Sequence, residues 1–449
     1  MKIFITLQDY LVLPFILILV YFIAFGIRNK YYPVGHPWRR YFIKGLNVKI
    51  LGAIFIGMLY QYYYRGGDTA NYFLQAKTLN SSFSESPIKW LNLMIGAPDW
   101  FDSRYQQYIS NMKWYGIWTS YTVIVSTALL NIFTFNTYLP TSVLFAFISY
   151  SGVWAMFRTF AKLYPHLLHP VALVTLFIPS TFIWGSGVFK DTICLFGLGW
   201  MIYGTYKVLI ARDMSARSIL MLLLSAFLIF KVKKYILVAF VPALALWVIA
   251  LYSDKVKIRF FKPLLFVVSG GVFAASLLLF SSAFQEQLGE YSLENVAETS
   301  RITRTYILRV SGDEGSAYDL GAIDPTPLGF IKKMPAGINV TLFRPYLWES
   351  GKIIMFVNAL ESLLILLLTL KVIFSLGPAR LWRAFMGDGT LQFCLVFALI
   401  FAFAIGISTY NFGSLSRYRI PCLPLYGMAL VLLYYSKNPP EKKLLSFRL

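Results

Sequence analysis

Long apolar segments recur along the whole chain, separated by shorter polar segments that hold most of the charged residues. A helix of about 20 apolar residues crosses the ~30 Å hydrocarbon core of a bilayer. Candidate spans lie near residues 11–27, 48–64, 116–134, 141–160, 170–187, 191–209, 217–231, 235–252, 263–281, 351–374, 391–409 and 421–436. Lipid offers no water to unpaired backbone groups, so each segment is expected to be helical. The pattern predicts an all-α, polytopic integral membrane protein.

Composition supports this class and excludes others. Of the 449 residues, 58% are hydrophobic and only 14% are charged, with a mean hydropathy of +0.63. No stretch resembles a soluble domain, so residues 1–449 are interpreted as a single transmembrane domain. The net charge of +21 is spread over short segments between apolar runs, which is typical of membrane topology and indicates no nucleic-acid partner. Residues 11–27 lack a following cleavage site of small residues and are expected to remain as a span.

Lys and Arg predict the orientation, because they gather on the cytoplasmic side of a membrane. The segment 28–49 holds six cations and no acid, and 254–262 and the tail after residue 437 are also basic, so all three are expected inside. Two larger loops are expected outside. These are the first outer loop, 65–115, with amphipathic helices, and the large outer loop, 282–350, which carries nine of the chain's twenty acids.

If every candidate segment spans the membrane, the first outer loop and the cytoplasmic tail cannot both be on their predicted sides. The number of crossings between them is then wrong by one. Segment 116–134 follows an amphipathic, aromatic-rich stretch typical of the headgroup region, so it is expected either to lie in the interface or to re-enter the membrane. About 11 (10–12) transmembrane helices remain. The N-terminus is then outside and the C-terminus inside.

Cysteine and histidine predict no metal site. Cys194, Cys394 and Cys422 lie in or beside apolar runs, and the three histidines lack the spacing of metal ligands. Candidate chemistry therefore has to come from the charged residues at the ends of the spans.

Asp68 is the first candidate, because it follows two glycines just beyond an apolar run. Gly66 and Gly67 free the backbone to turn, and Tyr72 would lie one helical turn after Asp68. One interpretation is a helix cap at the interface. The other is a carboxylate that accepts a proton from an acceptor hydroxyl.

Lys190 and Asp191 form the second candidate, since almost no loop separates the apolar runs on either side of them. Charges so close to a membrane pair, snorkel or line a cavity. They form either a self-satisfied turn or a cation and a carboxylate facing an outer cleft. A further basic cluster consists of Lys231, Lys233 and Lys234. The predicted topology places it outside, where the charge rule does not expect cations. It is either a phosphate contact or a sign that the topology differs there.

Two further features precede the last spans. Arg417 and Arg419 lie on the outer side, where the charge rule does not explain them, and the guanidinium fork suits phosphate. At the end of the large outer loop, Arg344 and Glu349 either pair with each other or contact sugar. Trp348 offers an apolar face of the kind on which sugars pack.

Four motifs therefore occur in order: Gly-Asp-Thr-x-x-Tyr at 67–72, Ser-Gly-x-x-Lys-Asp at 186–191, Phe-Arg-Pro-x-x-Trp-Glu at 343–349 and Arg-Tyr-Arg-x-Pro-x-x-Pro at 417–424. Together they resemble bacterial exopolysaccharide and O-antigen polymerase-like membrane proteins and, more distantly, GT-C glycosyltransferases. The resemblance covers most of the chain by the order and spacing of these features. It implies glycosyl transfer from a polyprenyl-phosphate-linked sugar or oligosaccharide, in surface polysaccharide assembly. The expected location is the outer face of a bacterial cytoplasmic (inner) membrane.

Within this resemblance, Asp68 takes the place of the GT-C catalytic base, and Thr69 stands where GT-C enzymes often carry a second acid. The expected catalytic residues are Asp68, Lys190, Asp191 and Glu349. The expected substrate-binding residues are Tyr72, Lys233, Lys234, Arg344, Trp348, Arg417 and Arg419. Arg or a divalent cation would stabilise the leaving phosphate, and an inverting mechanism is an open option.

Two alternatives from other classes stay open. A transporter or flippase of lipid-linked oligosaccharide would use a basic cleft without a base, but it predicts polar residues deep in several spans. The polar groups are expected instead at outer membrane edges, which favours the enzyme. A non-catalytic membrane subunit of a secretion or motility assembly would explain the aromatic girdles but not the four motifs.

Overall fold

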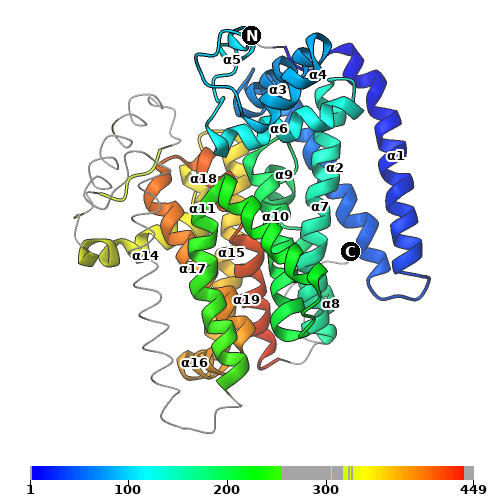
Figure 1. The fold of residues 1–449 in the computed structure, drawn as a ribbon. Coiled ribbons are helices and arrows are strands. Elements are labelled where there is room, and N and C mark those ends of the chain that lie inside the picture. The colour runs from blue at the N-terminus through cyan, green and yellow to red at the C-terminus, as the bar shows by residue number, and fades with distance from the viewer. Residues whose placement is uncertain (1–2, 254–304, 306–316, 322–323, 325–326, 439–449) are drawn as a thin grey trace. The chain divides into compact units, whose positions relative to one another are not determined.

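The computed structural model describes the chain except residues 1–2, 254–304, 306–316, 322–323, 325–326 and 439–449 (Figure 1). Most of the described part is helical, which confirms the all-α class there, and its one β-type contact is an isolated bridge between Ala317 and Asn411. The helices are α1 (Leu7–Tyr31), α2 (Arg39–Met58), α3 (Asp68–Glu85), α4 (Pro87–Ile95), α5 (Gln106–Ile109), α6 (Trp118–Phe133), α7 (Tyr138–Leu163), α8 (Leu168–Leu176), α9 (Pro179–Trp184), α10 (Lys190–Thr205), α11 (Ala216–Ser253), α14 (Pro327–Phe343), α15 (Ile353–Leu376), α16 (Pro378–Gly387), α17 (Gly389–Thr409), α18 (Phe412–Tyr418) and α19 (Leu423–Tyr435).

Seven of the described helices are long and apolar enough to cross a membrane: Leu7–Tyr31, Arg39–Tyr63, Tyr138–Leu163, Lys190–Ile210, Ala216–Leu251, Ile353–Leu376 and Gly389–Thr409. The chain is therefore a multi-pass membrane protein. The number is lower than the 11 (10–12) expected from the sequence. The predicted span 263–281, the basic segment 254–262 and most of the basic tail lie outside the described residues.

Several predicted spans differ from the structure. Segment 170–187 is broken into α8 and α9, because Pro179 disfavours a helical conformation at the residue before it. The last predicted span contains only the short helix α19. In contrast, segments 217–231 and 235–252 are the two helical parts of α11, and a kink at Lys233 (φ −148°, ψ 81°) separates them as the sequence predicts. Helix α6 is also short, which agrees with the prediction that segment 116–134 does not cross fully.

The structure describes the first of the two predicted outer loops throughout and the second only in part. Residues 65–115 contain α3, α4 and α5, as the amphipathic pattern predicts. Much of 282–350 lies outside the described residues, but its C-terminal part is the helix α14 rather than a loop. Phe330, Met334 and Ile338 recur at helical spacing and pack against α17. This apolar stripe is the reason that the segment folds as a packed helix.

The chain divides into two compact units, and each is described by itself. Unit 1 comprises Met1–Met156, Phe182–Gly204 and Ile219–Lys233. Unit 2 comprises Phe157–Thr181, Thr205–Ser218 and Lys234–Leu449.

Unit 1 depends on close backbone contact between helices. A Cβ on Gly199 of α10 would collide with the backbone of Gly152 in α7, and one on Gly152 would collide with Phe196. Gly52 of α2 lies equally close to the backbone of Phe182. Small residues at helix contacts are typical of membrane proteins, because they let the backbones approach.

Unit 2 is built around α17, of which most residues are buried. Gly406 of α17 lies directly against the backbone of Gly337 in α14. Beside it, Thr341 Oγ1 donates to the carbonyl of Ala402 at 2.7 Å. Helix α19 packs along α17 and α8.

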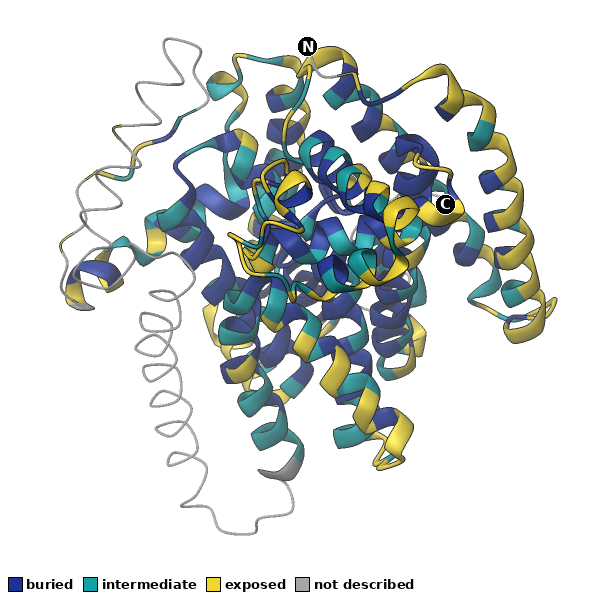
Figure 2. Ribbon diagram, turned by 45° about the horizontal axis from the view of Figure 1, so that its top comes forward, coloured by how far each residue is buried: buried dark blue, intermediate teal, exposed yellow. Residues whose placement is uncertain are grey.

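The outer side of α1 carries exposed apolar residues (Figure 2). Phe15 and Phe22 are 71% and 77% exposed, and the helix holds few buried residues. A continuous exposed stripe of this kind would be unfavourable in water. Contact with lipid explains it.

Candidate functional site

The glycine turn before Asp68 is present in unit 1. Gly66 and Gly67 have φ of 144° and 116°, a region that residues with a Cβ rarely adopt. Gly67 occupies the N-cap position of α3, and Asp68 is the first residue of the helix and is partly exposed. The prediction that Asp68 caps the helix is therefore wrong by one position. A carboxylate in the first turn is nevertheless favoured by the helix dipole.

Tyr60 joins the Asp68 turn to the Lys190 motif. The Gly66 amide donates to the Tyr60 carbonyl at 2.9 Å, and Gly67 lies directly against the Tyr60 ring. The same ring packs edge-on against Phe189, with centroids 5.4 Å apart. Tyr60 itself lies in a π-helical turn, Leu59–Tyr63, at the end of α2. The structure thus brings the first two sequence motifs together.

Two lysines lie at the start of α6. Lys190 Nζ donates to Thr119 Oγ1 at 3.3 Å. Lys231 Nζ lies 5.0 Å from the centre of the Trp118 ring, within the range of a cation–π contact. Both ammonium groups therefore lie at one end of unit 1, and both are partly exposed.

Asp191 and Lys233 form a buried ion pair between α10 and α11. Their side chains are 2% and 7% exposed. A charge taken out of water is tolerated only when it is paired and hydrogen-bonded, and each member of this pair meets that need of the other. Lys234, the next residue, belongs to unit 2 and is partly buried.

Lys49 supports the broken segment before α10 and was missed as a site by sequence reasoning. The sequence assigns Lys49 to a cytoplasmic loop, but the residue is 1% exposed inside α2. Its ammonium donates to the Gly185 carbonyl just after α9 and to Ser149 Oγ at 3.1 Å. Ser149 Oγ also donates to Gly185 at 3.1 Å. A non-helical backbone at membrane depth needs such partners, and a lone Lys within an apolar run was the available signal.

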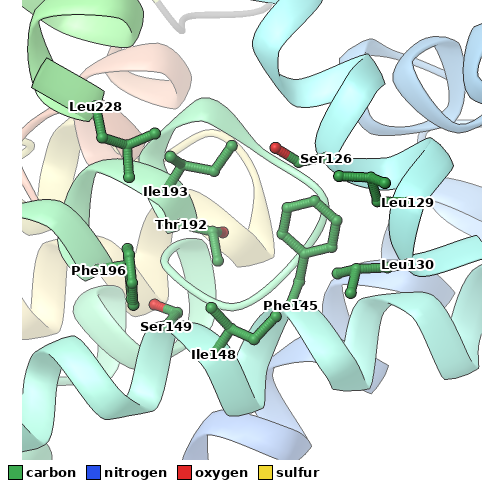
Figure 3. Close-up of a pocket in the computed structure, with 10 residues that line it drawn as sticks. All are labelled: Ser126, Leu129, Leu130, Phe145, Ile148, Ser149, Thr192, Ile193, Phe196 and Leu228. Carbon is green, nitrogen blue, oxygen red and sulfur yellow. The ribbon is translucent and has the colours of Figure 1, made fainter. Parts of the chain in front are cut away.

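A cavity of about 210 Å³ lies between α6, α7, α10 and the first part of α11 (Figure 3). Seven of its ten lining residues are apolar, and the others are Ser126, Ser149 and Thr192. Leu129 and Ile148 line it and are 44% and 41% exposed, so it opens onto the apolar surface. We call it the apolar groove.

The two lysines at the start of α6 lie one helical turn from the apolar groove. Lys190 precedes Ile193 by three residues on α10, and Lys231 follows Leu228 by three on α11. Residues three apart on a helix are neighbours on its surface. The groove therefore has a cationic rim.

In unit 2, Arg344 and Glu349 pair with each other, which the sequence left open. Arg344 Nε donates to both Glu349 carboxylate oxygens at 3.0 Å, and the Tyr346 amide donates to the same carboxylate at 2.8 Å. The Trp348 ring is 82% exposed and stacks on Tyr346, with centroids 4.9 Å apart.

Arg419 is enclosed in unit 2 and 0% exposed. Its Nη1 donates to the carbonyls of Thr341 and Arg344 at 3.2 and 3.1 Å and to Ser362 Oγ at 2.8 Å. Its Nη2 pairs with Glu361 Oε1 at 3.1 Å. This arrangement makes Arg419 part of the interior of unit 2, in contrast to the phosphate contact predicted from the sequence.

Glu361 is the second buried charge that sequence reasoning missed. Besides Arg419, it accepts hydrogen bonds from the Ser180 amide at 2.7 Å and the Ser180 hydroxyl at 2.6 Å. A single acid within the apolar run 351–374 was a usable signal, because intramembrane charges need partners.

Arg417 and Arg344 connect this interior to the surface of unit 2. Arg417 is partly exposed, and its guanidinium lies 5.0 Å from the centre of the Tyr418 ring. Arg344 lies 5.2 Å from the Phe412 ring centre, and its carbonyl accepts from Arg419 Nη1 at 3.1 Å, so the third and fourth sequence motifs also meet.

The predicted site residues thus form two groups. Asp68, Lys190, Asp191 and Lys233 lie in unit 1, together with Tyr72, which is buried against Trp114 with ring centroids 4.6 Å apart. The predicted residues of unit 2 are Lys234, Arg344, Trp348, Glu349, Arg417 and Arg419.

Metal ligands do not gather in either group. Among the described residues, no three or more His, Cys, Asp or Glu side chains are placed to hold a metal ion.

Comparison with protein-family models, with curated proteins and with solved structures finds no match for this chain.

Proposed function

We propose that the protein transfers a sugar or oligosaccharide from a polyprenyl-phosphate-linked donor to a glycan acceptor. The reaction would occur at the outer face of the cytoplasmic (inner) membrane, in surface polysaccharide assembly. The observation that carries the proposal is the junction of the Asp68 turn and the Lys190 motif across Tyr60. This junction supports a site with one carboxylate and one cation at the membrane surface.

The apolar groove suits the lipid part of such a donor. A polyprenyl chain is apolar and its head is anionic, so the groove would hold hydrocarbon while the cationic rim meets phosphate. Lys190 and Lys231 are partly exposed and can approach a phosphate, whereas Lys233 is occupied by Asp191.

The chemistry follows from these positions. Asp68 takes the proton of the acceptor hydroxyl, whose oxygen forms a bond to the anomeric carbon of the donor. The bond between that carbon and the phosphate oxygen breaks, and the electron pair leaves with the lipid phosphate. The cationic rim stabilises the charge that develops on this leaving group. One displacement of this kind inverts the anomeric centre.

Unit 2, taken by itself, also carries groups that suit a sugar and a phosphate. The exposed Trp348 ring, stacked on Tyr346, presents an apolar face on which a sugar ring can pack. Arg417 is accessible to a phosphate, whereas Arg419 and Glu349 have internal partners. We therefore keep Arg417 and Trp348 as substrate contacts and assign Arg419 and Glu349 to the interior support of unit 2.

Asp68→Asn tests the proposal. The change keeps the shape of the side chain but removes the proton acceptor, so turnover of a polyprenyl-phosphate-linked donor is expected to fall about 10²–10⁴-fold. Asp99→Asn, at an exposed acid of the same outer segment, is the matched control and should leave turnover unchanged. Polymer formation in a deletion strain and protein level in the membrane are the two measurements. Wild-type polymer from Asp68→Asn would contradict the assignment.

A transporter of lipid-linked oligosaccharide is the second candidate, and one observation favours it. Contrary to the sequence expectation, charged residues do lie within the spans, as Lys49 does beside the broken segment after α9. Broken helices of this kind bind substrates in transporters. Purified protein in liposomes separates the two functions, because a transporter moves a fluorescent lipid-linked saccharide across the bilayer without consuming it.

A further inference from the structure

A second cavity of unit 1 has a different character from the apolar groove. It encloses about 370 Å³ between α3 and the segment before α6. The residues that line it are Asn71, Leu74, Gln75, Thr78, Asn111 and Lys113. We call it the amide pocket.

The lining of the amide pocket suits a sugar. Five of the six residues are polar, three of them are amides, and none is a carboxylate. Amide and hydroxyl groups both donate and accept hydrogen bonds, as a ring of adjacent hydroxyl groups requires. A purely apolar ligand would leave these groups without partners and is disfavoured.

Two hydrogen bonds orient the amides. Gln75 Oε1 accepts from the Trp114 amide at 3.1 Å, which leaves the amide nitrogen as the donor end. Asn111 Nδ2 donates to the Gln107 carbonyl at 2.9 Å, which leaves the amide oxygen as the acceptor end. A donor and an acceptor are thus held in place at this pocket before a ligand arrives, which lowers the entropic cost of binding.

The amide pocket follows Asp68 along the same face of α3. Asn71, Gln75 and Thr78 come three, seven and ten residues after Asp68, a spacing that places all four on one side of a helix. With a rise of about 1.5 Å per residue, Asn71 lies about 4.5 Å along the axis from Asp68. A saccharide in the pocket would therefore extend towards the carboxylate.

We propose that the amide pocket binds a sugar unit of the acceptor glycan, and that Lys113 favours a unit bearing a carboxylate, such as a uronic acid. Lys113 is the one charged residue of the lining and is exposed. The role as acceptor site rests on the proposed function, whereas saccharide binding itself does not.

The test uses the full-length protein in nanodiscs, without donor. The probes are a disaccharide that contains glucuronic acid and the matching disaccharide of glucose, with binding measured by saturation-transfer NMR titration. Both should bind, the acidic one more tightly. Lys113→Gln should weaken the acidic probe about three- to fivefold, the range of an exposed ion pair, and leave the neutral probe unchanged.

Lys77→Gln is the matched control, because Lys77 is an exposed cation of α3 outside the lining. It makes the same change in net charge and should leave both probes unchanged. Asn111→Ala should weaken both probes alike. The proposal is overturned if neither probe binds, or if Lys77→Gln reduces acidic binding as much as Lys113→Gln does.

The saccharide site and the proposed function can fail independently, and the two failures give different results. If Asp68→Asn still makes polymer while Lys113→Gln loses the preference for glucuronic acid, the saccharide site stands and the catalytic assignment falls. If Asp68→Asn abolishes polymer and no probe binds, the reverse holds.

Discussion

Two charged clusters with similar residue types are built in opposite ways. In unit 1, Lys190 lies at the rim of the apolar groove and Asp68 at the head of α3, and both are partly exposed. In unit 2, Arg419 and Glu361 are buried and satisfy each other and their neighbours. Asp68, Lys190 and Arg419 all belong to motifs that the sequence marks as candidate chemistry, whereas Glu361 belongs to none.

The difference shows what burial does to a charge. A guanidinium with four internal hydrogen bonds cannot turn to a ligand without leaving Glu361 unpaired in a medium of low dielectric constant. A lysine at a rim can exchange a hydroxyl or an aromatic ring for a phosphate at small cost. Access therefore distinguishes a charge that supports the fold from one that meets a substrate.

The largest expected effect comes from breaking the buried pair. Arg419→Met or Glu361→Met leaves one charge without its partner, which should lower stability by about 3–5 kcal/mol. The double variant removes both charges and should recover much of that loss. The midpoint of thermal unfolding in detergent measures all three. If the single variants unfold at the wild-type temperature, the comparison between the two clusters fails.

Replacing the two arginines by lysine sharpens the same contrast. Arg419→Lys keeps the charge but loses the fork that reaches Glu361 and Ser362, so it should cost about 1.5–3 kcal/mol of stability. Arg417→Lys should leave stability within about 0.5 kcal/mol and lower affinity for the donor phosphate. Equal losses of stability at both positions would place Arg417 in the interior as well.

Both units contain glycines at close contacts between helices. Substituting these glycines therefore gives a loss of stability that should be similar in the two units. Gly199→Ala in unit 1 and Gly406→Ala in unit 2 each place a methyl group against a neighbouring backbone and should cost about 1–3 kcal/mol. Gly26→Ala on α1 meets no atom within 4 Å and should be neutral or stabilising. Thermal midpoints of the three variants check this, and a harmless Gly199→Ala would argue against tight packing of α7 on α10.

The smallest expected effect concerns Glu85 at the surface of unit 1. Hydrogen bonds from Lys89, Tyr108 and Gln107 hold the pKa of this carboxyl below its ordinary value of 4.5. Because the folded-state pKa is lowered, the stabilisation is present above pH 4.5 and is lost as the pH falls through the lower folded value. Hydrogen exchange of α5 amides should therefore accelerate in that acidic range. Glu85→Gln should show fast exchange at neutral pH already.

The sequence predicted the class and several interruptions correctly. Apolar runs of spanning length fixed the all-α membrane fold, because lipid permits little else. The positive φ of Gly66 and Gly67 and the break at Lys233 also follow local signals, namely paired glycines and a basic cluster between apolar runs. These positions could be predicted from the sequence because the residue and its nearest neighbours determine the backbone conformation there.

Tertiary structure alone decided which charges are accessible. Glu361 meets Arg419 across 58 residues of sequence, and Lys49 meets Gly185 across 136. Pattern and composition carry no information about such distant partners, so Arg419 looked like a phosphate ligand and Lys49 like a loop cation. The role of a charge in a membrane protein depends on the free energy of its desolvation, and that is set by the helices packed around it.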